Sequence, residues 1–174
     1  MTEYRKHDQQ ASTAEFRNQI FREFDLEGKK VLNVGCGNDY VEGWVNLDGD
    51  VRAQADMYVD LEDETELRLK LNKDEYDVIY CAHILEHIHN LVRLKSALTR
   101  ALAPGGLMVV VVPYYMSMDA WGDDTHCRAF SEESFLPSFW PGMDDIRINL
   151  IDLQKQLGKV RWIVAYLTKG GKDG

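Results

Sequence analysis

Apolar and polar positions along the chain switch repeatedly between two spacings. Ser12 and Glu15 form a capping-box pair ahead of Phe16, Ile20 and other apolar residues at helical spacing, which predicts a helix from about 13 to 24. Short continuous or alternating apolar runs predict strands instead. Strands are expected at 31–34, 44–48, 55–61, 76–81, 107–112, 146–153 and 160–168, and further helices at 62–71, 91–102 and from 131 onward. Pro104-Gly105-Gly106 is expected to form the turn before the strand at 107–112.

The order of these elements predicts the fold class. Strands alternate with helices, and the chain closes on two strands joined by a short connection around Gly158. This order favours an α/β fold, a mostly parallel sheet flanked by helices with an antiparallel C-terminal hairpin edge. Ligands of such sheets bind beyond the carboxyl ends of the strands. One rim should therefore carry the turn at Gly35, Asp48, Asp60, the segment 81–88 and the loop 113–130.

Composition limits the domain count and the partners. The chain has 174 residues, of which 45% are apolar and 10% aromatic, as expected for one globular domain over 1–174. Within it, 1–28 is expected to be an N-terminal helical segment and 113–145 a loop and helix on the substrate side. The formal net charge of -9 argues against non-specific binding to nucleic acid. A small-molecule substrate is the expected partner, and the oligomeric state stays open.

Targeting signals and cysteine usage predict the compartment. The first residues lack the apolar core of a signal peptide, and the longest apolar run, Leu107 to Val112, is too short to span a bilayer. The three cysteines are an odd number without metal-type spacing, so we expect reduced thiols. These features predict a cytoplasmic protein without a membrane segment.

The first strand runs into a glycine turn that resembles a nucleotide site. Gly35 and Gly37 allow a tight turn and close approach of a ligand, but Tyr40 stands where a dinucleotide fingerprint has its third glycine. No phosphate-binding P-loop sequence is present. Asp48, at the end of the next strand, offers a carboxylate acceptor for ribose hydroxyls. Together these residues favour a nucleoside ligand over a pyrophosphate.

Several motifs in this order resemble class I S-adenosylmethionine-dependent methyltransferases, especially a small group with a G-W-x-N-x-D second strand. The resemblance covers residues 29 to about 136 and implies a Rossmann-like fold. Its motifs are Val31-Leu32-Asn33-Val34-Gly35-Cys36-Gly37, Gly43-Trp44-Val45-Asn46-Leu47-Asp48, Tyr76-Asp77-Val78-Ile79-Tyr80 with His83-Ile84-Leu85-Glu86-His87, Leu102-Ala103-Pro104-Gly105-Gly106, and Asp124-Thr125-His126-Cys127-Arg128-Ala129-Phe130-Ser131.

The resemblance implies S-adenosyl-L-methionine as cofactor and S-adenosyl-L-homocysteine as product. Gly35 and Gly37 would pass beneath the methionine part, and Asp48 would bind the ribose. The remaining implied contacts are Asn33 and Cys36 at the turn, Asp60 and Leu61 beside the adenine, and Cys81, Ala82 and His83 on the methyl-facing side. Two alternatives stay open: Asp48 as a solvated acid, and Asp56 or an ordinary turn residue in place of Asp60.

The acceptor is expected on the side of the loop 113–130. Methyl transfer from a sulfonium needs alignment of the nucleophile and exclusion of water. A hydroxyl acceptor also benefits from a base, for which His126, His83 and Tyr114 are the candidates. No Asn/Asp-Pro-Pro-aromatic motif follows the strand at 76–81, which disfavours the amino-group methylases of nucleic acid bases and glutamine. An oxygen acceptor is slightly favoured. The alternative is a non-catalytic S-adenosylmethionine-binding subunit or sensor.

The segment His83-Ile84-Leu85-Glu86-His87 also spells H-x-x-E-H, a zinc-protease motif. That motif belongs to a helix in a much larger scaffold, whereas here it follows a buried strand. We therefore expect no metal, and we expect Glu86 and His87 to cap or anchor the following helix. The aromatic and methionine residues of the loop, among them Tyr115 and Trp121, are expected either to wall the acceptor site or to pack over the core.

Overall fold

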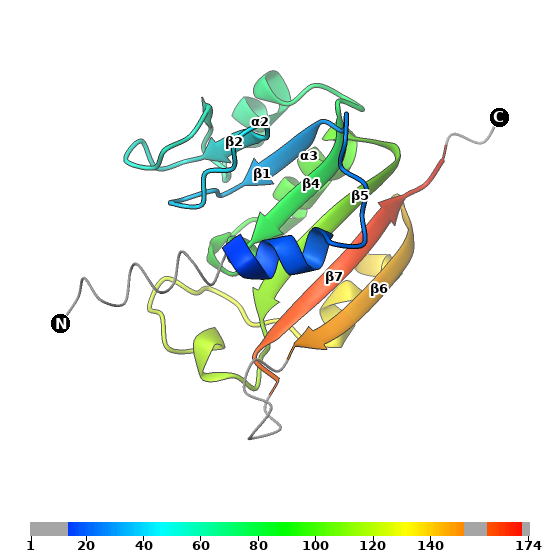
Figure 1. Ribbon diagram of the computed structural model, residues 1–174. Helices are drawn as coiled ribbons and strands as arrows, with labels where there is room; N and C mark the ends of the chain where they lie inside the picture. The colour runs from blue at the N-terminus through cyan, green and yellow to red at the C-terminus, as the bar shows by residue number, and fades with distance from the viewer. Residues whose placement is uncertain (1–13, 152–159, 172–174) are drawn as a thin grey trace.

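The computed structural model of the protein describes residues 14–151 and 160–171 (Figure 1). Within them, the strands form one seven-stranded sheet in the order β3-β2-β1-β4-β5-β7-β6. The strands are β1 (Val31–Val34), β2 (Val45–Asp48), β3 (Met57–Tyr58), β4 (Tyr76–Ala82), β5 (Leu102–Pro113), β6 (Met143–Ile151) and β7 (Trp162–Lys169). Only pairings with β7 are antiparallel among the described strands, so the predicted fold class, with its antiparallel hairpin at the edge, is confirmed.

Helices cover both faces of the sheet. Residues 14–21 form an N-terminal helix that lies in front of β4 and β7 in Figure 1, whereas α2 and α3 lie behind the sheet. The other helices and helical turns of the described residues are α2 (Glu64–Lys70), α3 (Leu91–Ala101), η1 (Leu85–His87), η2 (Met118–Ala120), η3 (Glu132–Phe135) and η4 (Pro137–Phe139). The predicted cap Ser12 and the connection around Gly158 lie outside the described residues. No helix in the described ranges is long and apolar enough to cross a membrane.

Alternation along the strands produces two apolar layers. In β1, Val31 belongs to the layer under the N-terminal helix, while Leu32 and Val34 belong to the layer under α2 and α3. All three side chains are almost completely buried. A strand buried on both faces reads as a continuous apolar run, which is why the sequence pattern located β1 correctly.

Two strands differ from the sequence prediction. The predicted turn at Pro104–Gly106 lies inside β5, where the pairing with β4 shifts register and Gly105 has a φ of +74°. The turn residues thus form an irregularity within the strand. β3 has only two residues, although its continuation stays attached, since the amide of Val59 donates to the carbonyl of Asp48 at 3.0 Å.

The strand register brings the carboxyl ends of the parallel strands to one edge. Val34 of β1 pairs with Leu47 of β2 and with Cys81 of β4, and Cys81 pairs with Val110 of β5. The segments that follow these strands therefore meet at one rim, as the sequence predicted.

Candidate functional site

The glycine turn after β1 requires glycine for two different reasons. Gly35 has a φ of +67°, and a Cβ there would lie 2.5 Å from Cγ1 of Ile84. Gly37 has a φ of +51°, and a Cβ there would meet no described atom within 4 Å. The side chain of Ile84 thus occupies the space that a Cβ at position 35 would need. The backbone of Gly37, in contrast, has open space beside it. That surface suits the close approach of a ligand.

Asp48 holds the turn and keeps capacity for a ligand. Its Oδ2 accepts the amide of Gly37 at 2.7 Å, and its Oδ1 accepts the amide of Asp50 at 2.8 Å. The residue is half-buried at the carboxyl end of β2. A carboxylate has about four lone-pair sites, so two backbone bonds leave acceptor positions for the hydroxyls of a ribose.

Asn33 is occupied within the turn. Its Nδ2 donates to the carbonyl of Asp39 at 2.8 Å and to Oδ1 of Asn46 at 3.1 Å. Asn46 in turn binds the backbone of Val41 in both directions and donates to the carboxylate of Asp56. This amide network holds the connection between β1 and β2, which contains no helix. The side chain of Asn33 thus supports the turn from behind.

The other predicted cofactor contacts divide into rim and core positions. Asp60 follows β3 and is exposed. It lies beside Gly49, since a Cβ added to Gly49 would be 4.0 Å from the Cα of Asp60. Leu61 and Cys81 belong to the buried core, and burial raises the pKa of the Cys81 thiol. Cys36 is also buried, and its pKa is raised to about 11 by burial and then by the charge of Asp48. Only backbone of these buried residues is available to a ligand at the rim.

His83 ends β4 in an unusual conformation. Its φ is +53°, one of two positive values among the described non-glycine residues. Nδ1 lies 3.4 Å from Oε1 of Glu86, and the ring packs edge-on against Trp162 at a centroid distance of 4.9 Å. A left-handed histidine costs backbone energy that the surroundings must offset, which is common at functional sites. This geometry leaves Nε2 as the nitrogen not directed at the carboxylate.

Glu86 and His87 do not cap the following helix, contrary to the sequence prediction. The side chain of Asn90 caps α3 by accepting the amide of Arg93, and Glu62 accepts the amide of Asn90. Glu86 instead points into the protein and is 1% exposed. The Glu86 carboxylate therefore does not lie at the helix end.

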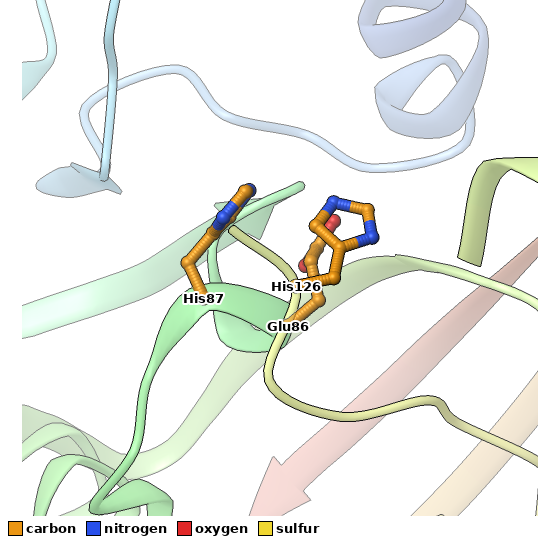
Figure 2. A group of neighbouring side chains, drawn as sticks. All are labelled: Glu86, His87 and His126. Carbon is orange, nitrogen blue, oxygen red and sulfur yellow. The ribbon is translucent and has the colours of Figure 1, made fainter. Parts of the chain in front are cut away.

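His126 comes from the long loop and meets this segment. Its ring packs edge-on against that of His87 at a centroid distance of 4.7 Å. Nδ1 of His126 lies 3.2 Å from the carbonyl of Ala120, and Nδ1 of His87 lies 2.9 Å from Oγ1 of Thr125. Figure 2 shows Glu86, His87 and His126 side by side, the first two from η1 and the third from the loop.

Tyr114 is a poor base in this setting. Its hydroxyl donates to Glu132 across 3.4 Å, and its pKa is raised, first by desolvation and then by the charge of Glu132. Both effects disfavour the phenolate. Tyr114 packs against the core, whereas Tyr115, Met116, Met118 and Trp121 are exposed and do not pack over it. A cavity of about 490 Å³ is lined by Tyr115, Trp121, Ala129, Ser131, Glu132 and Glu133.

Sequence reasoning missed Ile84, Trp162 and the amide of Asn46 as parts of the site. Ile84 fills the space beneath Gly35, and Trp162 holds the ring of His83. Trp162 reaches the site only because β7 pairs with β5, with Trp162 opposite Pro113. No local pattern signals that contact. The order Asn-x-Asp in β2 was the available signal for Asn46.

Comparisons with known proteins point to methyltransferases. The family model described as a methyltransferase domain matches residues 4–142. A ubiquinone biosynthesis O-methyltransferase from Hydrogenovibrio crunogenus is 26% identical over 110 residues, which cover 52% of this chain. The aligned part is 45% of that protein, so the chain spans less than half of the relative it matches.

Solved structures share the fold at low identity. An S-adenosylmethionine-dependent methyltransferase from Archaeoglobus fulgidus has a TM-score of 0.76 at 14% identity, covering 97% of this chain and 100% of that one. A possible histamine N-methyltransferase from Thermotoga maritima has a TM-score of 0.62 at 14% identity, with 81% and 82% covered. The N-methyltransferase NodS from Bradyrhizobium japonicum has a TM-score of 0.60 at 15% identity, covering 90% of this chain and 96% of that one. These likenesses confirm the Rossmann-like fold.

Proposed function

Since the chain belongs to the methyltransferase domain family, we propose that it transfers the methyl group of S-adenosylmethionine to an oxygen atom of a small molecule. S-adenosylmethionine is the cofactor of this family and fold, and S-adenosylhomocysteine is the product. The O-methyltransferase name of the curated relative supports an oxygen acceptor.

The residues at the rim fit the cofactor in a defined way. The bare backbone at Gly37 would pass beneath the methionine part, and Asp48 would accept the ribose hydroxyls on its free lone pairs. Asp60, exposed on the next loop, would lie toward the adenine. Ala82, the last residue of β4, and His83, which follows it, would face the methyl group of the cofactor. Asn33 would act indirectly, by holding the turn.

The main observation in favour of an oxygen acceptor is that the carboxylate of Glu86 lies close to the ring of His83. The Glu86 carboxylate lies 3.4 Å from Nδ1 of His83, beyond a good hydrogen bond, and its charge favours the proton on that nitrogen, which leaves Nε2 to accept a proton. In the proposed step, the acceptor oxygen forms a bond to the methyl carbon while the carbon–sulfur bond breaks, and the hydroxyl proton passes to Nε2 of His83. The proton then leaves to water. A neutral amine acceptor already has an available lone pair and needs this base less.

His126 remains a second candidate base with a weaker arrangement. Its Nδ1 is held by a carbonyl oxygen, which orients the ring without supplying a negative charge. The cavity of about 490 Å³ beside the loop offers space for a small acceptor, bordered by Glu132 and Glu133. His83 is therefore the first residue to test.

The experiment is a turnover assay that detects S-adenosylhomocysteine over matched panels of hydroxyl and amine acceptors. His83→Asn tests the base, since asparagine tolerates a positive φ better than alanine. We expect His83→Asn to keep cofactor affinity and to lower turnover of a hydroxyl acceptor about 10²- to 10⁴-fold. His89→Ala is the matched control on an exposed side chain outside this pair. Cofactor binding without turnover on any acceptor would favour the non-catalytic subunit or sensor instead.

A further inference from the structure

The side chains of Glu86, His87 and His126 form a compact cluster where the loop 113–130 meets η1 (Figure 2). Their ligand atoms lie within 4.8 Å of one another, although the residues come from η1 and from a loop far along the chain. We propose that this cluster binds one divalent transition-metal ion of the Zn²⁺ class. The proposal does not depend on the methyl acceptor.

Glu86 supplies the observation that points to a cation. Its side chain is only 2% exposed, and neither carboxylate oxygen has a hydrogen-bond partner within the described residues. A buried carboxylate without a partner is costly, so such groups are normally paired or bound to a metal. The nitrogen of His83 at 3.4 Å from Oε1 compensates one side of the carboxylate incompletely. A divalent ion contacting the other side would compensate the charge.

The hydrogen bonds of His87 leave its second nitrogen free for a metal. The hydroxyl of Thr125 donates to Oδ1 of Asp123 at 2.5 Å, so its single proton is used. Thr125 must then accept the Nδ1 proton of His87 at 2.9 Å. Neutral His87 therefore carries its lone pair on Nε2. Such an outer hydrogen bond, itself backed by a carboxylate, is typical of metal-bound histidines.

His126 reaches the same state by a different partner. A carbonyl oxygen only accepts, so the contact of 3.2 Å with Ala120 places the proton of His126 on Nδ1. Its Nε2 is therefore the unprotonated nitrogen in the neutral ring. Both imidazoles are thus held in the tautomer that ligates through Nε2.

The ligand set and spacing select the class of ion. Two imidazoles and a carboxylate suit Zn²⁺ and its transition-metal neighbours, whereas Mg²⁺ and Ca²⁺ prefer oxygen ligands. Tetrahedral bonds of about 2.0–2.1 Å place ligand atoms roughly 3.4 Å apart. Small side-chain rotations close the cluster to that spacing from its limit of 4.8 Å. Three protein ligands leave a further coordination position, and the ion would tie the loop to η1.

The test is direct metal binding by the full chain after treatment with a chelator. We expect one Zn²⁺ per chain in calorimetry, and visible absorption typical of tetrahedral nitrogen and oxygen ligation when Co²⁺ is the probe. Glu86→Gln and His126→Ala should each weaken binding by more than about 100-fold, since second-shell changes alone cost 10- to 100-fold. His89→Ala, on the same segment with an 82% exposed side chain, should keep the wild-type affinity.

A second measurement guards against misfolded variants. In chelator, Glu86→Gln should melt at or above the wild-type temperature, because a costly buried charge is removed. Zn²⁺ should raise the melting temperature of the wild type and leave that of Glu86→Gln unchanged. The proposal fails if the wild type shows no stoichiometric binding, or if both ligand variants bind as tightly as the wild type. A thiolate-to-cobalt band would also overturn it, by assigning the ion to Cys127.

Discussion

At the scale of single residues, the acids around β2 and β3 have different roles. Asp48 accepts two backbone amides and stays half-buried at the rim. Asp56 is spent on the amide of Asn46 and on the hydroxyl of Tyr40. The alternative in which Asp56 takes the place of Asp60 beside the adenine is thereby disfavoured, because the Asp56 carboxylate already has its partners.

The first residue-scale prediction concerns Asp48. Asp48→Ala should weaken S-adenosylmethionine binding by about 1.5–3 kcal/mol, the range for lost hydrogen bonds to a charged group. Isothermal titration calorimetry measures the change without knowledge of the acceptor. Asp50→Ala is the neighbouring control, because the Asp50 carboxylate pairs with the exposed guanidinium of Arg52. Wild-type affinity in Asp48→Ala would remove its role at the ribose.

The second residue-scale prediction concerns Asn46. Its fully buried amide bonds Asn33, Val41, Trp44 and Asp56. Asn46→Ala leaves these partners unsatisfied and should lower the free energy of unfolding by about 2–4 kcal/mol. Tyr40→Phe removes one exposed bond of the same network and should cost about 1 kcal/mol or less. Urea denaturation compares the two, and equal small losses would contradict the network.

At the scale of elements, patterning located most helices and strands but not how they end. The apolar runs of β1 and β4 predicted buried strands because both faces of the central sheet are covered. The Pro104–Gly106 stretch was mistaken for a turn, since a register shift within a strand uses the same residues. Similarly, Glu86 was assigned to a helix end because sequence alone does not reveal that its side chain points inward.

The site shows the same division between local and long-range information. Gly35, Gly37 and Asp48 could be placed near one another from spacing, because a strand, its turn and the next strand end are close in sequence. The placement of Trp162 against His83, and of His126 against His87, depends on strand pairing and on the path of a long loop. Contacts between such distant segments have no signature in a single sequence.

The element-scale prediction concerns the glycine turn. Gly35→Ala combines a positive φ with a Cβ 2.5 Å from Ile84. It should lower the free energy of unfolding by about 1 kcal/mol through backbone strain, and further through the clash with Ile84. Gly28→Ala is matched in φ at +69° and has no described atom within 4 Å, so it should cost the strain alone. Thermal unfolding of both variants, of Ile84→Ala, and of Gly35→Ala combined with Ile84→Ala, gives the coupling energy between positions 35 and 84. Equal losses in the two single variants would contradict the contact.

At the scale of the whole molecule, acids stabilised in the folded state couple stability to pH. Hydrogen bonds from the amide and side chain of Asn46 lower the pKa of Asp56 below its ordinary 3.8. For Glu75, burial raises the pKa, but the hydrogen bonds from Lys30 and Asn72 lower it by more, so that the pKa lies below its ordinary value. A depressed folded pKa means that the unfolded chain takes up protons first as the pH falls.

The whole-molecule prediction follows from that sign. Each such acid contributes its stability above its ordinary pKa and loses it as the pH falls through the lower folded value, so stability should decline below about pH 4. Toward the sequence pI of about 5.0, the net charge of -9 at pH 7 vanishes, which relieves repulsion just before this decline begins. Urea denaturation from pH 7 to pH 2 measures the profile in the wild type and in Asp56→Asn. The stability difference between them should be constant near neutrality and shrink on the acid side, since protonation removes the charge that the substitution removes. A difference that keeps its full size at pH 2 would show that Asp56 acts through packing and not through its charge.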